Sequence, residues 1–379
     1  MPDFKGLFKN AEDEKDYDKK AQLLSYYLNV FRTEASRPKT PADKQIVKEY
    51  ILGELKNLLP AIDNAPDYKT KDAIFAVDDK LLGLMAIIFN PNEFSEEDFK
   101  IVTSVIEKVK KETVLESTLD EAFEKQKIEQ SDIEALIKVA RSVSDEYQKG
   151  KLYQGFLYHK DSLNKLSPEA KNVFAEYIAE ELKRYLNLSE YNDEIVNVLE
   201  IIADIAKYFA NDSLLSLVSK LLELNYNNIR YYAIETLISK KVKFNATVIE
   251  QLAKDLKYAE LTYSLLQKYN LTNLFPAEYS SPEYLAKSDM VHWLNYPTEL
   301  GETPNKIELL GELQVKKDKY YIFKFKSDSD NLSDDLKGLW LIGWSSPSSG
   351  NTFSDFDKLA DYEKKNLKKT LKNIRKQLL

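Results

Sequence analysis

Residues 13–270 alternate between segments with apolar residues at helical spacing and short polar turns. Ser95, Ser131 and Ser167 begin three of these segments, 36 positions apart. A serine followed by acidic residues or proline is typical of a helix start, because its hydroxyl accepts a hydrogen bond from a backbone N–H of the first turn. The interval fits a unit of two helices. The pattern predicts helices near residues 13–33, 41–59, 70–89, 96–116, 132–147, 168–187, 192–210, 212–224, 228–240, 246–256 and 258–269.

One helical segment combines an apolar stripe with a small residue at its centre. Ile229, Ala233 and Leu237 stand at i, i+4 and i+8, so a second helix can approach closely at the alanine. A polar turn, Arg230 one place after the first aliphatic residue, then Ala and Leu resemble the start of the second helix of a HEAT repeat. The resemblance extends over residues 191–270. It implies an armadillo-type α-solenoid of stacked helix pairs, an architecture that binds protein partners.

The pattern changes after Phe275, where short segments with period-two alternation follow. Segments 307–315, 319–326 and 338–344 predict three strands of an antiparallel β-meander. A closing helix is expected over 354–379, with the apolar stripe Phe356, Leu359, Leu367, Leu371, Ile374 and Leu378. A three-stranded sheet needs cover to be stable, and this helix or the end of the helical array could supply it.

Aromatic residues concentrate in this C-terminal region. Trp293, Tyr320, Trp340 and Trp344 form a candidate partner-binding surface for a protein or peptide. The competing interpretation is that alternate aromatic residues make the buried face of the sheet. The strand around Trp340 is apolar on both faces, so one face is left for the closing helix or a partner.

Charge and hydropathy limit the partners and the compartment. The net charge is −8, with 62 acidic and 54 basic residues well mixed, and a nucleic-acid groove needs surplus Lys and Arg. No nucleic-acid partner is therefore expected. The sequence contains no run of 18 apolar residues, so no transmembrane helix is expected. The N-terminus lacks a signal pattern, which favours the cytoplasm, or the periplasm or cell envelope if a signal sequence has been removed. The abundance of Asn, Lys, Ile and Tyr is typical of AT-rich bacterial genomes.

Few residues point to catalysis. The chain has no cysteine, and its two histidines, His159 and His292, are far apart in sequence, which argues against thiolate chemistry, a His-based triad and a multi-His metal site. Asp72, Asp78 and Asp79 could be paired carboxylates, but a solvated helix face is the expected interpretation. Phosphate-loop, nucleophile-elbow and HExxH motifs are absent from the sequence. We expect no cofactor, no metal and no catalytic residue.

These observations predict a mostly α protein of the α+β class. Residues 1–190 are expected to form a helical region, either a degenerate continuation of the repeats or a separate helical domain. Residues 191–275 are expected to form HEAT-like helix pairs, and 276–379 a small α+β module. The predicted function is a non-enzymatic protein–protein interaction scaffold. The alternative is an enzyme with a carboxylate- or Tyr-based site between the helical array and the C-terminal sheet.

Overall fold

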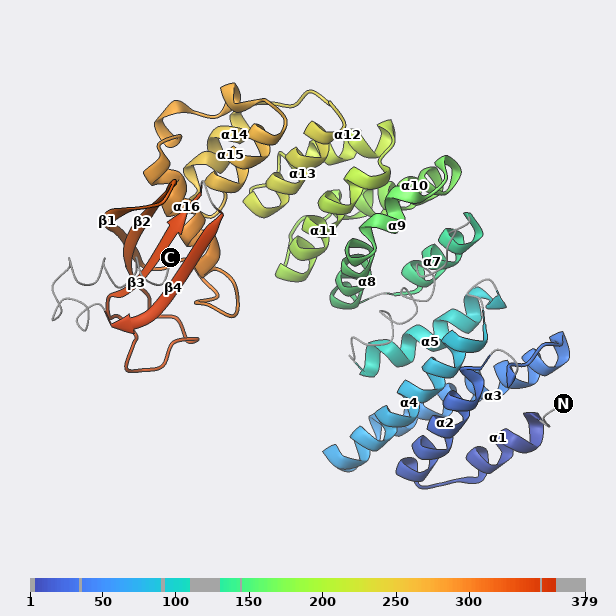
Figure 1. Ribbon diagram of the computed structural model, residues 1–379. Coiled ribbons are helices and arrows are strands. Elements are labelled where there is room, and N and C mark those ends of the chain that lie inside the picture. Colours follow the sequence, from blue (N-terminus) through green and yellow to red (C-terminus); the bar gives the residue numbers. More distant parts are fainter. Residues whose placement is uncertain are drawn as a thin grey trace. The chain divides into compact units, whose positions relative to one another are not determined.

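The computed structural model describes residues 4–33, 36–89, 93–109, 130–143, 145–347 and 350–358 (Figure 1). The chain divides into two compact units, Met1–Val218 and Ser219–Leu379. The described residues are mostly helical, with a small antiparallel sheet near the C-terminus, which confirms the predicted α+β class. The division between the units falls within the predicted 191–275 segment.

The first unit consists of helices that pack mainly against near neighbours in the chain. α2 packs against α4, α3 against α1, α4 and α5, α7 against α5 and α10, and α11 against α8, α9 and α10. The bounds are α1 (Phe4–Asp13), α2 (Tyr17–Phe31), α3 (Pro41–Asp63), α4 (Tyr68–Ile88), α5 (Glu96–Val109), α7 (Gln130–Ser142), α8 (Glu146–Tyr158), α9 (Lys160–Lys165), α10 (Pro168–Leu186), α11 (Asp193–Phe209) and α12 (Asp212–Leu221), the last of which reaches into the second unit.

The helix that the sequence predicts over residues 13–33 corresponds to α2, whereas α1 precedes it and is not predicted. α1 ends at Asp13, and α2 begins after Asp16, whose side chain accepts a hydrogen bond from a backbone N–H of the first turn. This cap begins α2 at Tyr17, so the predicted helix is present and only its boundaries differ from the prediction. The helix predicted over 132–147 likewise ends early, at Ser142.

Residues 146–165 form α8 and α9, which the sequence pattern does not predict. α8 is buried on several sides, and its buried residues include Gln148, Lys149 and Gly150. A helix without a single apolar stripe gives little periodic signal. α8 lies so close to α11 that a Cβ atom on Gly150 would be 3.1 Å from Nδ2 of Asn197.

The helices of the second unit form an ordered series. α13 packs against α14, α14 against α15 and α15 against α16. The bounds are α13 (Asn227–Ser239), α14 (Thr247–Lys254), α15 (Ala259–Lys268) and α16 (Pro282–Leu294), with the 3-10 helices η3 (Thr272–Leu274) and η4 (Ala277–Tyr279) between α15 and α16.

The stripe predicted on α13 is buried. Ile229, Ala233 and Leu237 are each 0% exposed, so the small central residue does lie where neighbouring atoms approach. Arg230 is also buried, and its Nε donates a hydrogen bond to the carbonyl oxygen of Leu222 at 3.3 Å. The arginine therefore ties the connection between α12 and α13 to the second of these helices.

The sheet is a four-stranded antiparallel meander of order β1-β2-β3-β4. Its strands are β1 (Lys306–Val315), β2 (Asp318–Lys326), β3 (Leu341–Ser346) and β4 (Asn351–Lys358). β1 and β2 agree with the predicted strands, whereas β3 lies a few residues beyond the predicted 338–344. The closing helix predicted over 354–379 is wrong at its start, because residues 351–358 form β4. Residues 359–379 lie outside the described part of the chain.

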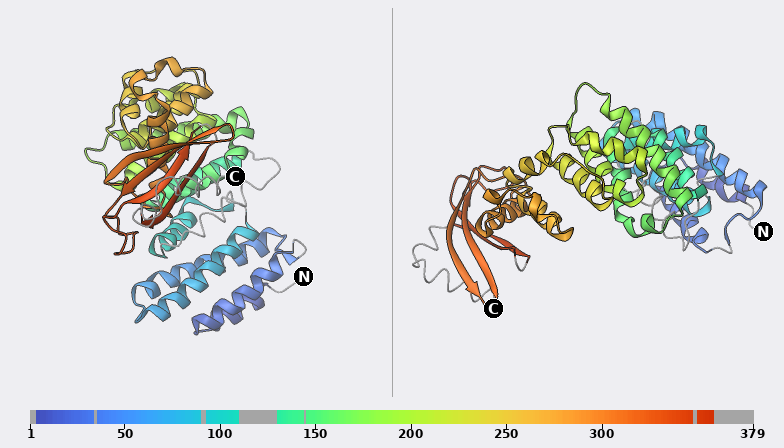
Figure 2. Two further views of the ribbon diagram at one scale, coloured as in Figure 1. Left: turned by 60° about the vertical axis from the view of Figure 1, so that its left-hand side comes forward. Right: turned by 90° about the horizontal axis from the view of Figure 1, so that it is seen from above.

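The two faces of the sheet carry different apolar clusters. α16 lies against one face of the sheet (Figure 2). On this face Phe323 and Phe325 belong to one buried cluster with Met290 of the helix. Gly343 makes this close approach possible, because a Cβ atom there would lie 2.5 Å from Cε of Met290. The opposite face carries a second cluster, which consists of Val315, Tyr320, Ile322, Ile342 and Trp344.

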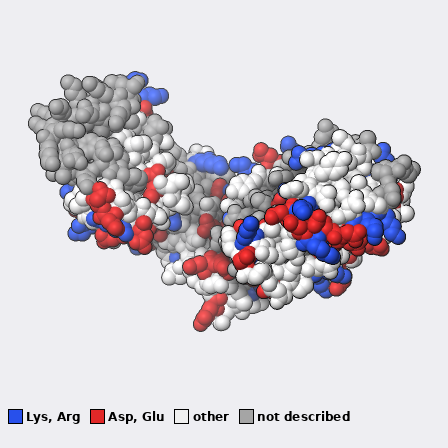
Figure 3. Space-filling view, turned by 90° about the horizontal axis from the view of Figure 1, so that it is seen from below, with Lys and Arg blue, Asp and Glu red and all other residues white. Residues whose placement is uncertain are grey.

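The length and apolar character of the described helices, and the charges on the surface, bear on whether the chain crosses a membrane. Within the described ranges, no helix combines the length and apolar character that crossing a bilayer requires. The face drawn in Figure 3 carries acidic and basic side chains interspersed rather than separated by sign.

Candidate functional site

Trp293 belongs to the contact between α16 and the sheet. Its ring is half-buried and packs against the cluster around Phe323. The indole Nε1 donates a hydrogen bond to Oγ of Ser354 at 3.1 Å, and Ser354 in turn donates to the carboxylate of Glu299. This tryptophan therefore joins α16 to β4.

The other three predicted aromatic residues lie with the cluster on the opposite face of the sheet. Tyr320 and Trp344 are each 4% exposed, and the Trp344 ring stacks on Phe353 with centroids 4.9 Å apart. Trp340 is half-buried at the edge of this cluster, where Nζ of Lys324 lies 4.4 Å from its ring centroid. The structure thus separates Trp293 from the other three and leaves Trp293 and Trp340 half-buried, whereas Tyr320 and Trp344 are buried.

A groove in the second unit offers a more open apolar surface. It has a volume of about 490 Å³ and is lined by Ile238, Lys241, Val242, Lys243, Phe244, Ala246, Tyr269, Leu271 and Leu274. We call it the α13–α15 groove, because these residues follow or end those two helices. Ile238 is buried, whereas Val242, Phe244, Tyr269, Leu271 and Leu274 are half-buried. The volume lies in the range of about 300–1,000 Å³ that is usual for ligand pockets.

Two matching helix ends build the groove. After α13, Lys241 adopts a φ of 57°, and the amide of Val242 donates to the Leu237 carbonyl at 2.9 Å. After α15, Asn270 adopts a φ of 58°, and the amide of Leu271 donates a hydrogen bond to the carbonyl of Leu266, again five residues earlier, at 2.8 Å. Both are Schellman motifs, in which a left-handed residue ends the helix and an apolar residue follows. The two apolar residues come together in the groove.

The charges of the α13–α15 groove have one sign. Lys241 and Lys243 are exposed, and no Asp or Glu belongs to the lining. Neither lysine makes an ion pair with any residue that the structure describes. The groove therefore offers an apolar floor and a cationic rim.

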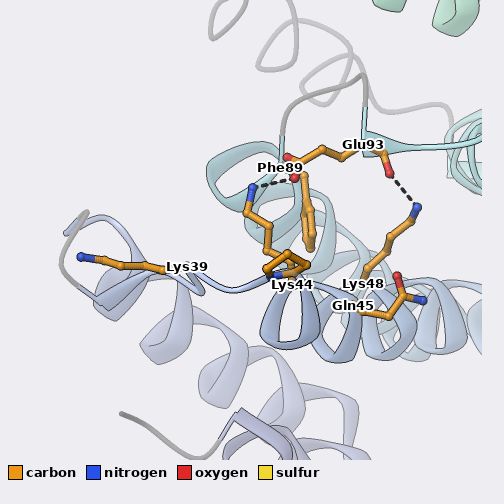
Figure 4. A pocket seen from close by; sticks show the side chains of 7 residues that line it. Lys39, Lys44, Gln45, Lys48, Phe89 and Glu93 are labelled. Atoms are coloured by element: carbon orange, nitrogen blue, oxygen red, sulfur yellow. Dashed lines mark hydrogen bonds and ion pairs between the residues drawn. The ribbon is translucent and has the colours of Figure 1, made fainter.

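A second cavity, of about 280 Å³, lies at the start of α3 (Figure 4). Two of its three lysines are already neutralised: Lys44 pairs with Glu93 at 2.6 Å, and Lys48 pairs with Asp98 at 2.7 Å. Lys39 points away from the other two (Figure 4). The cavity therefore presents little net charge to an anion.

A polar hollow of about 390 Å³ lies between α2 and α3. Its most buried charges are Lys20 and Glu54, whose Nζ and Oε2 atoms are 2.6 Å apart. Because the two charges neutralise each other, the floor of this hollow has no free charge to recognise a ligand.

A buried hydrogen-bond network joins α8 to α10. Lys149 Nζ lies 2.9 Å from Oε2 of Glu181, which also accepts from the hydroxyl of Tyr153 at 3.3 Å. The hydroxyls of Tyr153 and Tyr177 are 2.8 Å apart. Burial raises the pKa of both tyrosines above the ordinary value. Both hydroxyls therefore stay protonated at neutral pH, which suits a structural network better than a catalytic one.

The three aspartates of α4 differ in exposure, and Asp72 is exposed as the sequence predicts. Asp78 is 1% exposed, so that expectation is wrong for this residue, whereas Asp79 pairs with Lys80 at 2.8 Å on the surface. α4 packs against both α2 and α3, which buries more of its circumference than the sequence pattern indicates. His159 caps the end of α8. His292 is half-buried on α16, and burial lowers its pKa.

Two carboxylates meet between α15 and α16. Burial raises the pKa of Glu260. The hydrogen bond from Ser264 lowers this pKa, and the negative charge of nearby Asp289 raises it further. Asp289 accepts hydrogen bonds from the hydroxyls of Ser345, at 2.7 Å, and Thr352. Asp289 thus holds β3 and β4 on α16. Across the described ranges, no three His, Asp or Glu side chains gather as metal ligands would.

Comparisons with known proteins give no further guidance. No family model, no curated protein and no solved structure matches the chain.

Proposed function

We propose that this protein is a non-enzymatic scaffold of stacked, HEAT-like helix pairs that binds a protein or peptide partner in the α13–α15 groove. The observation that carries the proposal is the pairing of two identical helix ends around an accessible apolar floor. Val242 and Leu271 occupy the same position in their motifs and line one groove. Successive helix pairs of a solenoid repeat their turns in this way, and their exposed ends form binding surfaces. A cytoplasmic location and the absence of a nucleic-acid partner remain predictions.

The proposal is tested by selecting random peptides displayed on phage against the full chain. A variant with Phe244→Ser and Leu274→Ser removes two large half-buried side chains from the groove. The matched control is Leu339→Ser, which removes an apolar side chain that is 42% exposed elsewhere in the unit. Circular dichroism establishes that all three proteins are folded.

We expect peptides that enrich on the wild type and on Leu339→Ser and are lost on the double variant. Failure to enrich any peptide, or equal binding to the double variant, would overturn the groove as the binding site.

The carboxylates between α15 and α16 favour a second candidate, an enzyme with its site between the helices and the sheet. The supporting observation is the raised pKa of Glu260, because a buried carboxyl beside a second one can act as a general acid. The commitment of Asp289 to two hydroxyls of the sheet argues for a structural role instead. A turnover found in an esterase, phosphatase, peptidase and glycosidase screen and abolished by Glu260→Gln in a folded protein would favour the enzyme.

A further inference from the structure

We propose that the segment bound in the α13–α15 groove is acidic as well as apolar. The partner places Leu- or Phe-type side chains on the floor and Asp or Glu side chains against Lys241 and Lys243. The inference rests on the proposed function and adds to it the chemical class of the partner.

The argument from charge begins with the composition of the lining. The chain has a net charge of −8, yet the lining of this groove holds two lysines and no acidic residue. Lysines in the last turn of a helix are commonly explained by the helix dipole. Lys243 follows the last residue of α13, Ser239, by four positions, and it lies beyond that turn. Its exposed side chain belongs to the lining and makes no ion pair with a described residue, so charge complementarity favours an acidic ligand.

The shape of the groove limits how much of a bound ligand it can shield from solvent. Phe244, Leu271 and Leu274 are half-buried, so the groove leaves part of each side chain in contact with solvent and does not enclose a ligand. A free acyl chain would need cover along its whole length, whereas a peptide can insert a few side chains and leave its backbone in solvent. The surface therefore fits a peptide segment of a larger partner better than a lipid.

The test uses a fluorescein-labelled peptide in which Leu and Phe alternate with Glu, titrated with the full-length protein by fluorescence polarisation. Two further peptides replace every Glu by Lys, or Leu and Phe by Ser. The protein variants are Lys243→Glu and, as the matched control, Lys317→Glu, an exposed lysine in the turn between β1 and β2. Oleate is added as a competitor.

We expect the acidic peptide to bind at least about fivefold more tightly than the lysine peptide, and the serine peptide not to bind. Lys243→Glu should lower the affinity for the acidic peptide by about fivefold or more, whereas Lys317→Glu should leave that affinity unchanged. Added salt should lower the affinity of the wild type for the acidic peptide. Equal binding of the acidic and lysine peptides, or no effect of Lys243→Glu, would overturn the inference. Binding of oleate without any of the three peptides would also overturn it. Display selection that yields groove-dependent peptides without acidic residues would refute this inference while leaving the proposed function intact.

Discussion

Replacing Glu181 by Gln should destabilise the first unit far more than the same change at the adjacent Glu180. Glu181 is 13% exposed in its side chain, its partner Lys149 is 7% exposed, and their charged atoms are 2.9 Å apart. Glu180 pairs with Arg141 at 2.6 Å, but these side chains are 62% and 57% exposed. The two substitutions remove the same charge from neighbouring positions of α10. The difference between them therefore measures the buried contacts of Glu181, which also pairs with Arg184 at 3.3 Å.

The expected magnitudes follow from that difference in exposure. Removing one partner of a buried ion pair leaves the other charge uncompensated, which costs about 3–5 kcal/mol of unfolding free energy. Glutamine still offers an oxygen acceptor to Lys149 and Tyr153, so about 2–4 kcal/mol is expected for Glu181→Gln. An exposed pair contributes about 1 kcal/mol or less, which sets the expectation for Glu180→Gln.

The assay is urea unfolding followed by far-ultraviolet circular dichroism, with hydrogen exchange read from peptides of α8 and α10. Tryptophan fluorescence serves as an internal control, because Trp293, Trp340 and Trp344 all belong to the second unit. We expect faster exchange in α8 and α10 of the Glu181→Gln protein. A double variant with Lys149→Met and Glu181→Leu should recover about half of the lost stability, since an apolar pair replaces the buried charges. Equal, small losses in the two single variants would refute the role assigned to burial.

Four other changes test separate parts of the structure. Ala233→Leu should lower the stability of the second unit by about 1–3 kcal/mol in chemical unfolding, because the alanine is fully buried on α13; an unchanged midpoint would contradict the close packing. Gly343→Ala should cost a similar amount, about 1–3 kcal/mol, since its Cβ would meet Met290 and the backbone of β4, and the tryptophan fluorescence transition reports it. Glu260 has a raised pKa, so the fold favours its neutral carboxyl, and the stability that protonation contributes is lost as the pH rises through that pKa. The Glu260→Gln protein should therefore melt at a higher temperature than the wild type at about pH 8 and at the same temperature at about pH 4. A difference in melting temperature that does not change with pH would contradict this prediction. Deleting residues 359–379, which the sequence predicts to contain an apolar helical stripe, should increase binding of a hydrophobic dye, and unchanged dye binding would show that they cover nothing.

Helix existence was predictable wherever a cap preceded a single apolar stripe. The Thr40 hydroxyl accepts from the Asp43 amide at 3.1 Å, and Ser167 accepts from the Ala170 amide at 3.2 Å, as the sequence indicates. α8 was not predictable, because it buries glycine and polar residues such as Lys149 that acquire their partners only through α10. The signal for such a helix lies in tertiary contacts, which a periodicity analysis does not contain.

The fourth strand was hidden for a related reason. Residues 351–358 contain Phe353 and Phe356 with an otherwise polar sequence, so they lack the regular alternation of a half-buried strand. The Ser354–Asp357 segment also reads as a helix start, because a serine precedes acidic residues. In the fold, Gly350 adopts a φ of 66° and its amide donates to the Ser346 carbonyl at 2.9 Å, which closes a hairpin and pairs the segment with β3. Pairing with a hydrophobic neighbour overrides the local helix signal.

The candidate groove consists of different residues from the aromatic surface that the sequence predicts, and both stay predictions of where a partner binds. Large aromatic residues dominate the sequence signal, yet most of those on the sheet are needed to fill its two faces, and Tyr320 and Trp344 are buried there. The accessible apolar surface of the groove combines Phe244 and Tyr269 with aliphatic residues. Two of these, Val242 and Leu271, each follow a left-handed residue that is not glycine. Glycine is the usual signal for such a helix end and asparagine the less common one, so Asn270 carries a weak signal and Lys241 carries none. It follows that a search for the partner should vary the helix ends around Lys243, where exposure and charge coincide, before the tryptophans of the sheet.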